Sequence, residues 1–213
     1  MNGNRIASPN TNDTSKNETW QMINRRSLVW GVAAILVAAP SSVHAHSKNE
    51  QFSIDTKYLP QVVAINLPYE AGTVVVDTSN KFLYLVEGTG TARRYGIGVG
   101  RAGLAWSGVA EVGRKAKWPR WTPTANMIRR QPNKYARYAG GVAGGPNNPL
   151  GSRALYLFRD GRDTYYRIHG TTEPWTIGKA ISNGCIRLVN DHVNDLYERV
   201  PVGATVVVLN NPR

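Results

Sequence analysis

"YYRIHGTTEPWTIGKAISNGCIRL", residues 165–188, is the stretch that decides both the fold and the chemistry expected of this chain. It contains Cys185, the only cysteine among 213 residues, and His169, which precedes it by 16 positions (185 − 169). His169 lies near the end of a strand expected over 164–170, and Cys185 directly follows a Ser-Asn-Gly turn. A lone cysteine has no intramolecular disulfide partner, so Cys185 is an inert buried residue, an intermolecular crosslink or a nucleophile.

The neighbours of Cys185 favour the nucleophile. A thiolate forms near neutral pH when a base or a cation lies close to it, and histidine is the commonest supplier. His169 is the strand-borne candidate base, because His192 is expected on the face of a helix away from its apolar stripe. Arg187 adds a charge that favours the thiolate or binds a carboxylate, so we expect the pKa of Cys185 to lie below about 8.5. The N–H groups of Gly184 and Cys185 would stabilise an oxyanion.

These residues also have purely structural interpretations. His169 is then a core histidine satisfied by a carbonyl, and Arg187 forms a surface salt bridge. A metal site is not expected, because one cysteine and one strand-borne histidine are too few ligands. Residues 96–103, "GIGVGRAG", resemble a dinucleotide-binding loop only in outline, because no helical pattern follows them. We therefore expect no metal and no cofactor.

The first 45 residues read as an export signal. Arg25 and Arg26 precede an apolar run over 28–39, Pro40 ends that run, and "VHA" at 43–45 fits a cleavage site with small residues. The apolar run is too short to span a bilayer comfortably. The paired arginines indicate the twin-arginine route, with an ordinary secretory signal or an uncleaved anchor as alternatives. We expect export, and no membrane span in the protein after cleavage.

Cleavage after Ala45 would leave 168 residues (213 − 45), enough for one domain with a real core. The formal net charge of the whole chain is +12. Such a charge calls for an anionic partner, and outside the cytoplasm a wall polymer or an anionic lipid is favoured over nucleic acid. Residues 113–141 carry eight basic residues and no acidic one, with aromatic residues interleaved. This segment is a solvated basic face or a cleft for an anionic, partly sugar-bearing substrate.

The fold class expected from the pattern is mainly β, a β-sandwich or partly closed barrel with one or two helices. A polar lead-in occupies 46–70. One helix is expected over 190–200, with Asn190 as its N-cap, and a shorter one over 124–131. Asp160-Gly161 is expected at the tip of a hairpin. Strands rich in β-branched and aromatic residues are expected over 73–77, 82–86, 92–99, 153–158, 164–170 and 204–210.

"IHGT…SNGCIRL" resembles the L,D-transpeptidase catalytic domain family, in which a His-Gly pair precedes a Ser-x-Gly-Cys-x-Arg block by 14 to 17 residues. The segments "WPRWTPT", "NPLGSRALYLF" and "VPVGATVVVL" are also similar to periplasmic members, and the resemblance covers about residues 71–210. One position departs from the pattern: many members have histidine where Asn183 stands. That departure leaves the role of position 183 open.

The resemblance implies a β-rich fold peculiar to the family and a peptidoglycan crosslinking enzyme in the periplasm, expected to be a monomer. Such an enzyme attacks a tetrapeptide stem, releases D-Ala and passes the acyl group from a cysteine thioester to an amine of a second stem. The implied roles are a nucleophile (Cys185), a base (His169), a carbonyl that orients it (Gly170), oxyanion donors (Gly184 and Cys185, with Asn183), a turn or substrate contact (Ser182) and a carboxylate or loop contact (Arg187).

Three alternatives stay open. Water as the acceptor would make the protein an L,D-carboxypeptidase. An amine of an outer-membrane protein as the acceptor would make it an anchoring enzyme. A non-catalytic module that binds the cell wall would leave Cys185 inert.

Overall fold

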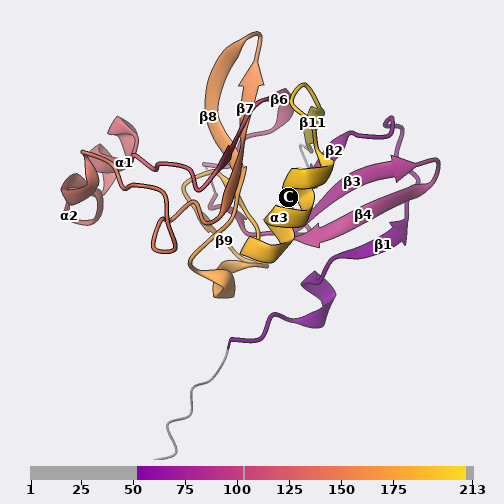
Figure 1. Cartoon of the computed structure of the whole chain (residues 1–213), viewed down its shortest axis with the longest axis horizontal. Coiled ribbons are helices and arrows are strands. Elements are labelled where there is room, and N and C mark those ends of the chain that lie inside the picture. Colours follow the sequence, from indigo (N-terminus) through magenta and orange to yellow (C-terminus); the bar gives the residue numbers. More distant parts are fainter. Residues whose placement is uncertain (1–51, 103, 210–213) are drawn as a thin grey trace, which may run out of the picture. The chain divides into compact units, whose positions relative to one another are not determined.

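The computed structural model describes residues 52–102 and 104–209 (Figure 1). The expected export signal over 1–45 and the first residues of the lead-in lie outside this range, so that expectation stays a prediction. The mainly β class is confirmed, and most strands form where the sequence predicts them. The strands are β1 (Gln61–Ala64), β2 (Val74–Asp77), β3 (Phe82–Gly88), β4 (Thr91–Gly96), β5 (Val99–Gly100), β6 (Gly108–Lys117), β7 (Arg153–Arg159), β8 (Arg162–His169), β9 (Ala180–Ser182), β10 (Ile186–Arg187) and β11 (Thr205–Val208).

Nine of these strands form one mixed sheet in the order β1-β4-β3-β2-β11-β6-β7-β8-β10, and β5 pairs with β9 in a small parallel sheet. The last strand, β11, lies in the middle of the large sheet between β2 and β6. β10 pairs in parallel with β8 at one edge, which brings the segment around Cys185 beside the strand that ends at His169. This pairing between segments far apart in the sequence builds the candidate site.

The lead-in is not separate from the domain. Residues 61–64, "QVVA", form β1 and pair antiparallel with β4, from Gln61 opposite Arg94 to Ala64 opposite Thr91. Residues 61–64 of the expected lead-in thus belong to the large sheet. The sequence did not predict β1, because its short run of β-branched residues is surrounded by polar residues and prolines.

Local sequence accounts for the hairpin that leads into the site. β7 and β8 are joined by Asp160 and Gly161, with φ of 50° and 70°, as expected for a two-residue turn that needs positive φ at both positions. Arg159 pairs with Arg162 across the turn. The Asp-Gly pair thus fixes the register in which β8 starts.

Three α-helices are present in the described residues rather than one or two: α1 (Ala125–Arg130), α2 (Pro132–Tyr135) and α3 (Asn190–Arg199). Thr124 caps α1, since its Oγ1 accepts from the N–H of Met127 at 3.2 Å. α1 and α2 separate because a residue that precedes proline disfavours the helical region, and Gln131 has φ −143°. Short 3-10 turns are η1 (Thr56–Tyr58), η2 (Ala136–Tyr138) and η3 (Pro174–Thr176).

Helix α3 packs against β7 and β8 and closes the core on that side (Figure 1). Its predicted apolar stripe is correct, because Val193, Leu196 and Val200 are fully buried. His192, expected away from that stripe, is also buried, because the face of α3 that packs is wider than the stripe. The predicted N-cap is wrong: Val189 occupies that position, and the side-chain oxygen of Asn190 accepts from the N–H of Ser152 at 3.1 Å instead.

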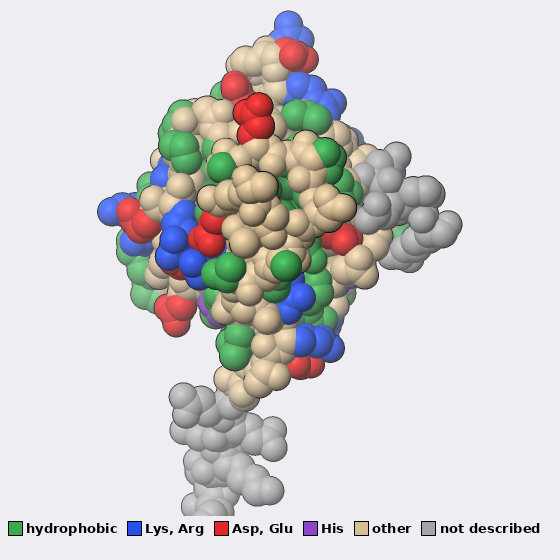
Figure 2. All heavy atoms as spheres, turned by 90° about the vertical axis from the view of Figure 1, so that its right-hand side faces the viewer, with side chains coloured by type: hydrophobic (Ala, Val, Ile, Leu, Met, Phe, Trp, Pro, Cys, Tyr) green, Lys and Arg blue, Asp and Glu red, His purple; other side chains and the backbone are tan. Residues whose placement is uncertain are grey.

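The face drawn in Figure 2 carries basic and acidic side chains interspersed, rather than one continuous basic patch. Over residues 52–102 and 104–209, no helix is long and apolar enough to cross a membrane.

Candidate active site

Parallel pairing of β8 and β10 sets the frame of the site. His169 lies opposite Arg187, and the His169 carbonyl accepts from the N–H of Leu188 at 2.8 Å. Extending this register by two residues places Cys185 opposite Arg167. Residues two apart on a strand point to the same face, so Arg167 and His169 share the face that Cys185 meets. The structure thus brings the cysteine turn and the histidine strand together.

The turn before Cys185 is held by Ser182. Its Oγ donates to the Cys185 carbonyl at 2.6 Å and accepts from the N–H of Gly184 at 3.1 Å. Gly184 has φ of 127°, and a Cβ there would lie 2.8 Å from both the Leu104 carbonyl oxygen and the ring of Tyr166. The N–H of Gly184, expected as an oxyanion donor, has Ser182 Oγ as its partner in this structure. The Cys185 N–H is the candidate that remains in the turn.

Asn183 connects the turn to two other segments. Its Nδ2 donates to the Tyr135 hydroxyl of α2 at 2.7 Å, and its Oδ1 accepts from Nη2 of Arg101 at 3.0 Å. Both ends of the amide are therefore engaged in holding the turn. In this structure the contacts of Asn183 link the turn to α2 and to Arg101.

His169 is almost fully buried, and its Nδ1 lies 2.5 Å from the Gly170 carbonyl. A carbonyl only accepts hydrogen bonds, so Nδ1 carries the proton of the neutral ring and Nε2 is the basic nitrogen. The pKa of His169 is lowered to about 3, chiefly by burial and then by the positive charge of Arg187, while the hydrogen bond with the Gly170 carbonyl opposes the lowering. The imidazole is therefore neutral at pH 7.

Cys185 is partly buried, and its Sγ lies 3.9 Å from the Tyr165 carbonyl. Among the described residues this carbonyl is the hydrogen-bond partner of the thiol, and the imidazole is not. Burial raises the pKa of Cys185, although a hydrogen bond from the Arg167 backbone and the charges of Arg167 and Arg187 lower it. The expected lowering of the cysteine pKa is thus wrong in direction, because the desolvation of the thiolate outweighs the nearby cations.

Arg187 is mostly buried and forms an ion pair with Glu173, with 2.8 Å between Nη1 and Oε2. Glu173 belongs to the loop between β8 and β9, so this contact agrees with the loop-holding alternative for Arg187. In the part of the chain that the structure covers, Nε of Arg187 is buried without a hydrogen-bond partner.

Several residues of the site had no signal in the sequence. Tyr165 and Arg167 contact the sulfur, Glu173 pairs with Arg187, and Arg101 holds Asn183. Tyr135 is different, because it belongs to the basic and aromatic segment over 113–141. That segment thus supplies a contact to the turn before Cys185.

Comparison with known proteins finds similarity to one family of catalytic domains. The model of the L,D-transpeptidase catalytic domain matches residues 71–208. "Probable L,D-transpeptidase ErfK/SrfK" of Salmonella typhimurium is 36% identical over 161 residues, which are 74% of this chain and 50% of that protein. "Probable L,D-transpeptidase YbiS" of Escherichia coli K12 is 34% identical over 158 residues, 72% of this chain and 49% of that protein. The chain thus spans about half the length of these curated relatives.

A solved structure from Brucella melitensis, described as a "Probable carnitine operon oxidoreductase caia", is 56% identical, with a TM-score of 0.51. The match covers 73% of this chain and 96% of that chain. The name of that protein indicates an oxidoreductase activity. In this chain, β5 and β6 follow Gly96, and the described residues between it and α1 form no helix. The strand-turn-helix unit of a dinucleotide loop is therefore absent from that part of the structure.

Proposed function

Because the chain belongs to the L,D-transpeptidase catalytic domain family, we propose that it crosslinks peptidoglycan in the periplasm through a thioester on Cys185. The donor is a tetrapeptide stem, and the acceptor is the side-chain amine of a second stem, which gives a 3-3 crosslink. The observation that carries the proposal is the fixed proton arrangement of His169. Its Nδ1 is tied to the Gly170 carbonyl, so Nε2 is the nitrogen left to act as the base.

In the first half-reaction the sulfur attacks the carbonyl carbon of the third stem residue. The thiol proton leaves the Tyr165 carbonyl and passes to Nε2 of His169. The resting pair is a neutral thiol and a neutral imidazole, so the proton moves as the S–C bond forms. The N–H of Cys185 supports the oxyanion. The bond to D-Ala then breaks, and His169 returns the proton to the leaving amine.

In the second half-reaction the amine of another stem attacks the thioester. His169 takes one proton from that amine, the C–S bond breaks, and the sulfur is protonated again. The thioester retains the free energy of the cleaved peptide bond, so no cofactor is required. The guanidinium of Arg187, which pairs with Glu173, is the group assigned to a carboxylate of the stem.

The products identify the acceptor. The purified protein is incubated with disaccharide-tetrapeptide, and the products are separated and weighed by mass spectrometry. Free D-Ala with a 3-3 linked dimer supports the proposal, whereas D-Ala with tripeptide alone indicates a carboxypeptidase. Transfer only to an outer-membrane protein amine supplied in trans indicates an anchoring enzyme. If the tetrapeptide stays unchanged with every acceptor, the protein is better explained as a non-catalytic module that binds the cell wall.

The role of His169 has its own variant. His169→Gln removes the basic Nε2, and we expect acyl-enzyme formation to slow by at least about a hundredfold, the low end for a general base. Stopped-flow acylation of wild type and variant gives the two rates. Equal rates would show that the thiol reacts without this histidine.

A further inference from the structure

Strand β8 carries extra residues at the point where it passes Cys185. Tyr156 of β7 pairs with Arg167 and Phe158 pairs with Asp163, so one residue of β7 faces three residues of β8. The three residues 164–166 leave the ladder as a bulge. Bulges of this kind are common beside active sites, where they re-aim a group that the regular ladder would engage.

The centre of the bulge is Tyr165, in a conformation that a bulky residue rarely adopts. Its φ is 62°, and its side chain is 72% exposed, so packing of the ring does not hold the backbone there. A tyrosine with positive φ is strained and persists only when its surroundings impose the conformation. The chain therefore maintains this conformation for a reason other than the core.

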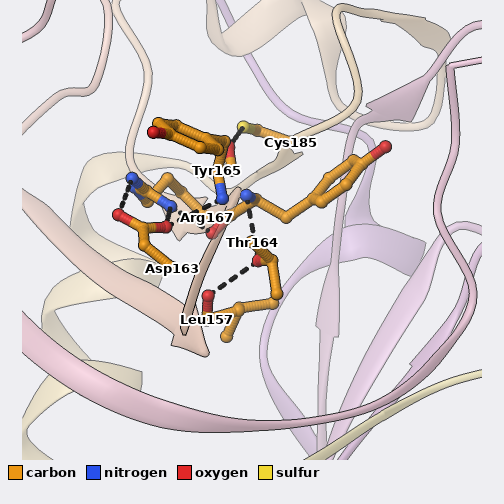
Figure 3. A network of polar contacts seen from close by, with 7 residues as sticks. Leu157, Asp163, Thr164, Tyr165, Arg167 and Cys185 are labelled. Atoms are coloured by element: carbon orange, nitrogen blue, oxygen red, sulfur yellow. Dashed lines mark hydrogen bonds and ion pairs between the residues drawn. The ribbon is translucent and has the colours of Figure 1, made fainter. Parts of the chain in front are cut away.

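Figure 3 shows the polar network that imposes it. Thr164 Oγ1 donates to the Leu157 carbonyl at 2.7 Å and accepts from the N–H of Tyr166 at 3.2 Å. The N–H of Tyr165 donates to Asp163 Oδ1 at 2.8 Å. Arg167 grips both oxygens of Asp163, at 2.6 Å and 2.7 Å. The bulge is thus fixed from both of its ends.

The strained conformation turns the Tyr165 carbonyl toward the sulfur. This oxygen lies 3.9 Å from Cys185 Sγ, whereas a carbonyl in the regular ladder would point to the neighbouring strand. In the resting protein it accepts from the thiol. Once the thiol loses its proton, the oxygen is a free acceptor next to the reacting carbon.

We propose that the Tyr165 carbonyl positions the amine that leaves and the amine that attacks. A primary amine has two N–H bonds. As its nitrogen attacks the thioester carbon, one proton passes to His169 and the other N–H donates to the Tyr165 carbonyl. The leaving D-Ala amine occupies the same place in the reverse direction. This inference rests on the proposed function and adds to it the group that favours an amine over unpositioned water.

The test is the partition of one acyl-enzyme between an amine and water. Tetrapeptide is incubated with the full chain and ¹⁵N-labelled D-alanine, and mass spectrometry gives the ratio of labelled tetrapeptide to tripeptide. Both products arise from the same acyl-enzyme, so the ratio does not depend on how fast it forms. A role of the bulge in stability alone would leave this ratio unmoved.

Two variants of Tyr165 separate the backbone from the ring. Tyr165→Val removes the ring and disfavours positive φ, because a β-branched residue is strained there. Tyr165→Gly also removes the ring but accepts this φ freely. We expect the ratio to fall about tenfold in the valine variant, the effect of losing one hydrogen bond. The glycine variant should retain most of the wild-type ratio.

A second pair loosens the bulge without touching Tyr165 or any charge. Thr164→Val loses both hydrogen bonds of the hydroxyl and should lower the ratio, and Thr164→Ser, which keeps the hydroxyl, should restore it. Equal losses in Tyr165→Val and Tyr165→Gly, or wild-type ratios in Tyr165→Val and Thr164→Val, would overturn the inference. A wild-type protein that forms neither product would instead contradict the proposed function.

Discussion

The protonation state of His169 is set by burial and by the positive charges of Arg187 and Arg167. The ring lies at the end of β8, almost without exposure, opposite Arg187. Charging it would place another cation in a poorly solvated site, and this is why its pKa falls to about 3. In an unfolded chain the pKa of a histidine is about 6.5. Folding therefore favours the neutral ring.

This difference predicts an acid-dependent loss of stability. Between about pH 6.5 and pH 3 the unfolded chain binds a proton at position 169 that the folded protein does not, so the free energy of unfolding falls as the pH falls, by at most about 1.4 kcal/mol per unit. His169→Gln removes this contribution. Urea denaturation of both proteins at pH 7, 5 and 4 measures it, and His192, which is present in both, cancels. Parallel pH dependences would contradict the assignment.

Single residues were predictable where chemistry restricts the choice. A lone cysteine after a glycine turn, with one histidine at a strand end, identified Cys185 and His169 as the residues of interest. The direction of the Cys185 pKa was not predictable, because it depends on how far the thiol is buried. The strained Tyr165 also left no trace, since tyrosine has no preference for positive φ.

Helix α2 is linked to the turn before Cys185 by the hydrogen bond between Tyr135 and Asn183. Tyr135→Phe and Asn183→Ala each remove this bond, and the double variant removes nothing further from it. We expect a coupling free energy of about 0.5–1.5 kcal/mol in a cycle of unfolding measurements. Additive effects of the two changes would mean that the bond contributes nothing to the position of the turn.

The carboxyl end of α3 is anchored by a lysine from β6. Lys115 Nζ donates to the Val200 carbonyl at 2.7 Å and to the Tyr197 carbonyl, and it lies 4.2 Å from the centre of the Tyr197 ring. Lys115→Met keeps the apolar stem and leaves the carbonyls without this donor, so we expect a loss of about 1–3 kcal/mol.

Lys117→Met is the matched control, because Lys117 is an exposed residue of the same strand. Its effect on the free energy of unfolding should stay within about 0.5 kcal/mol. If both variants unfold at the same urea concentration, the contacts of Lys115 do not stabilise α3.

Elements were predicted well where a local rule acts. The apolar spacing of α3 and the Asp-Gly turn of the β7–β8 hairpin both have such a rule. The prediction of Asn190 as the N-cap of α3 failed because its side-chain oxygen accepts from the N–H of Ser152. Ser152 is far from Asn190 in the sequence, so this contact could not be predicted. β1 was missed because its strand is completed only by pairing with β4. The bulge in β8 arises because three of its residues lie opposite one residue of β7, and the sequence of either strand alone does not predict this difference in number.

At the scale of the whole molecule, the order of strands could not be read from the sequence. β11 pairs with β2 and β6, and β10 pairs with β8. These pairings are parallel or join segments far apart in the sequence, so no turn motif predicts them. Resemblance to a family supplied what periodicity could not. The candidate site therefore depends on the sheet, since Cys185 directly precedes β10 and His169 ends β8, two strands that are brought together only by their pairing.

The assignment of Cys185 as the nucleophile is tested by the intact mass of the protein after treatment with imipenem over a series of pH values. A thiolate at Cys185 should open the β-lactam and retain one adduct per chain, because the sequence has one cysteine. The thiol pKa is raised, so the rate of adduct formation should still increase above about pH 8.5, where an ordinary thiol is half ionised. Cys185→Ala, folded as judged by circular dichroism, should gain no mass. An adduct in Cys185→Ala, or none in the wild type at any pH, would contradict the assignment of Cys185 as the nucleophile.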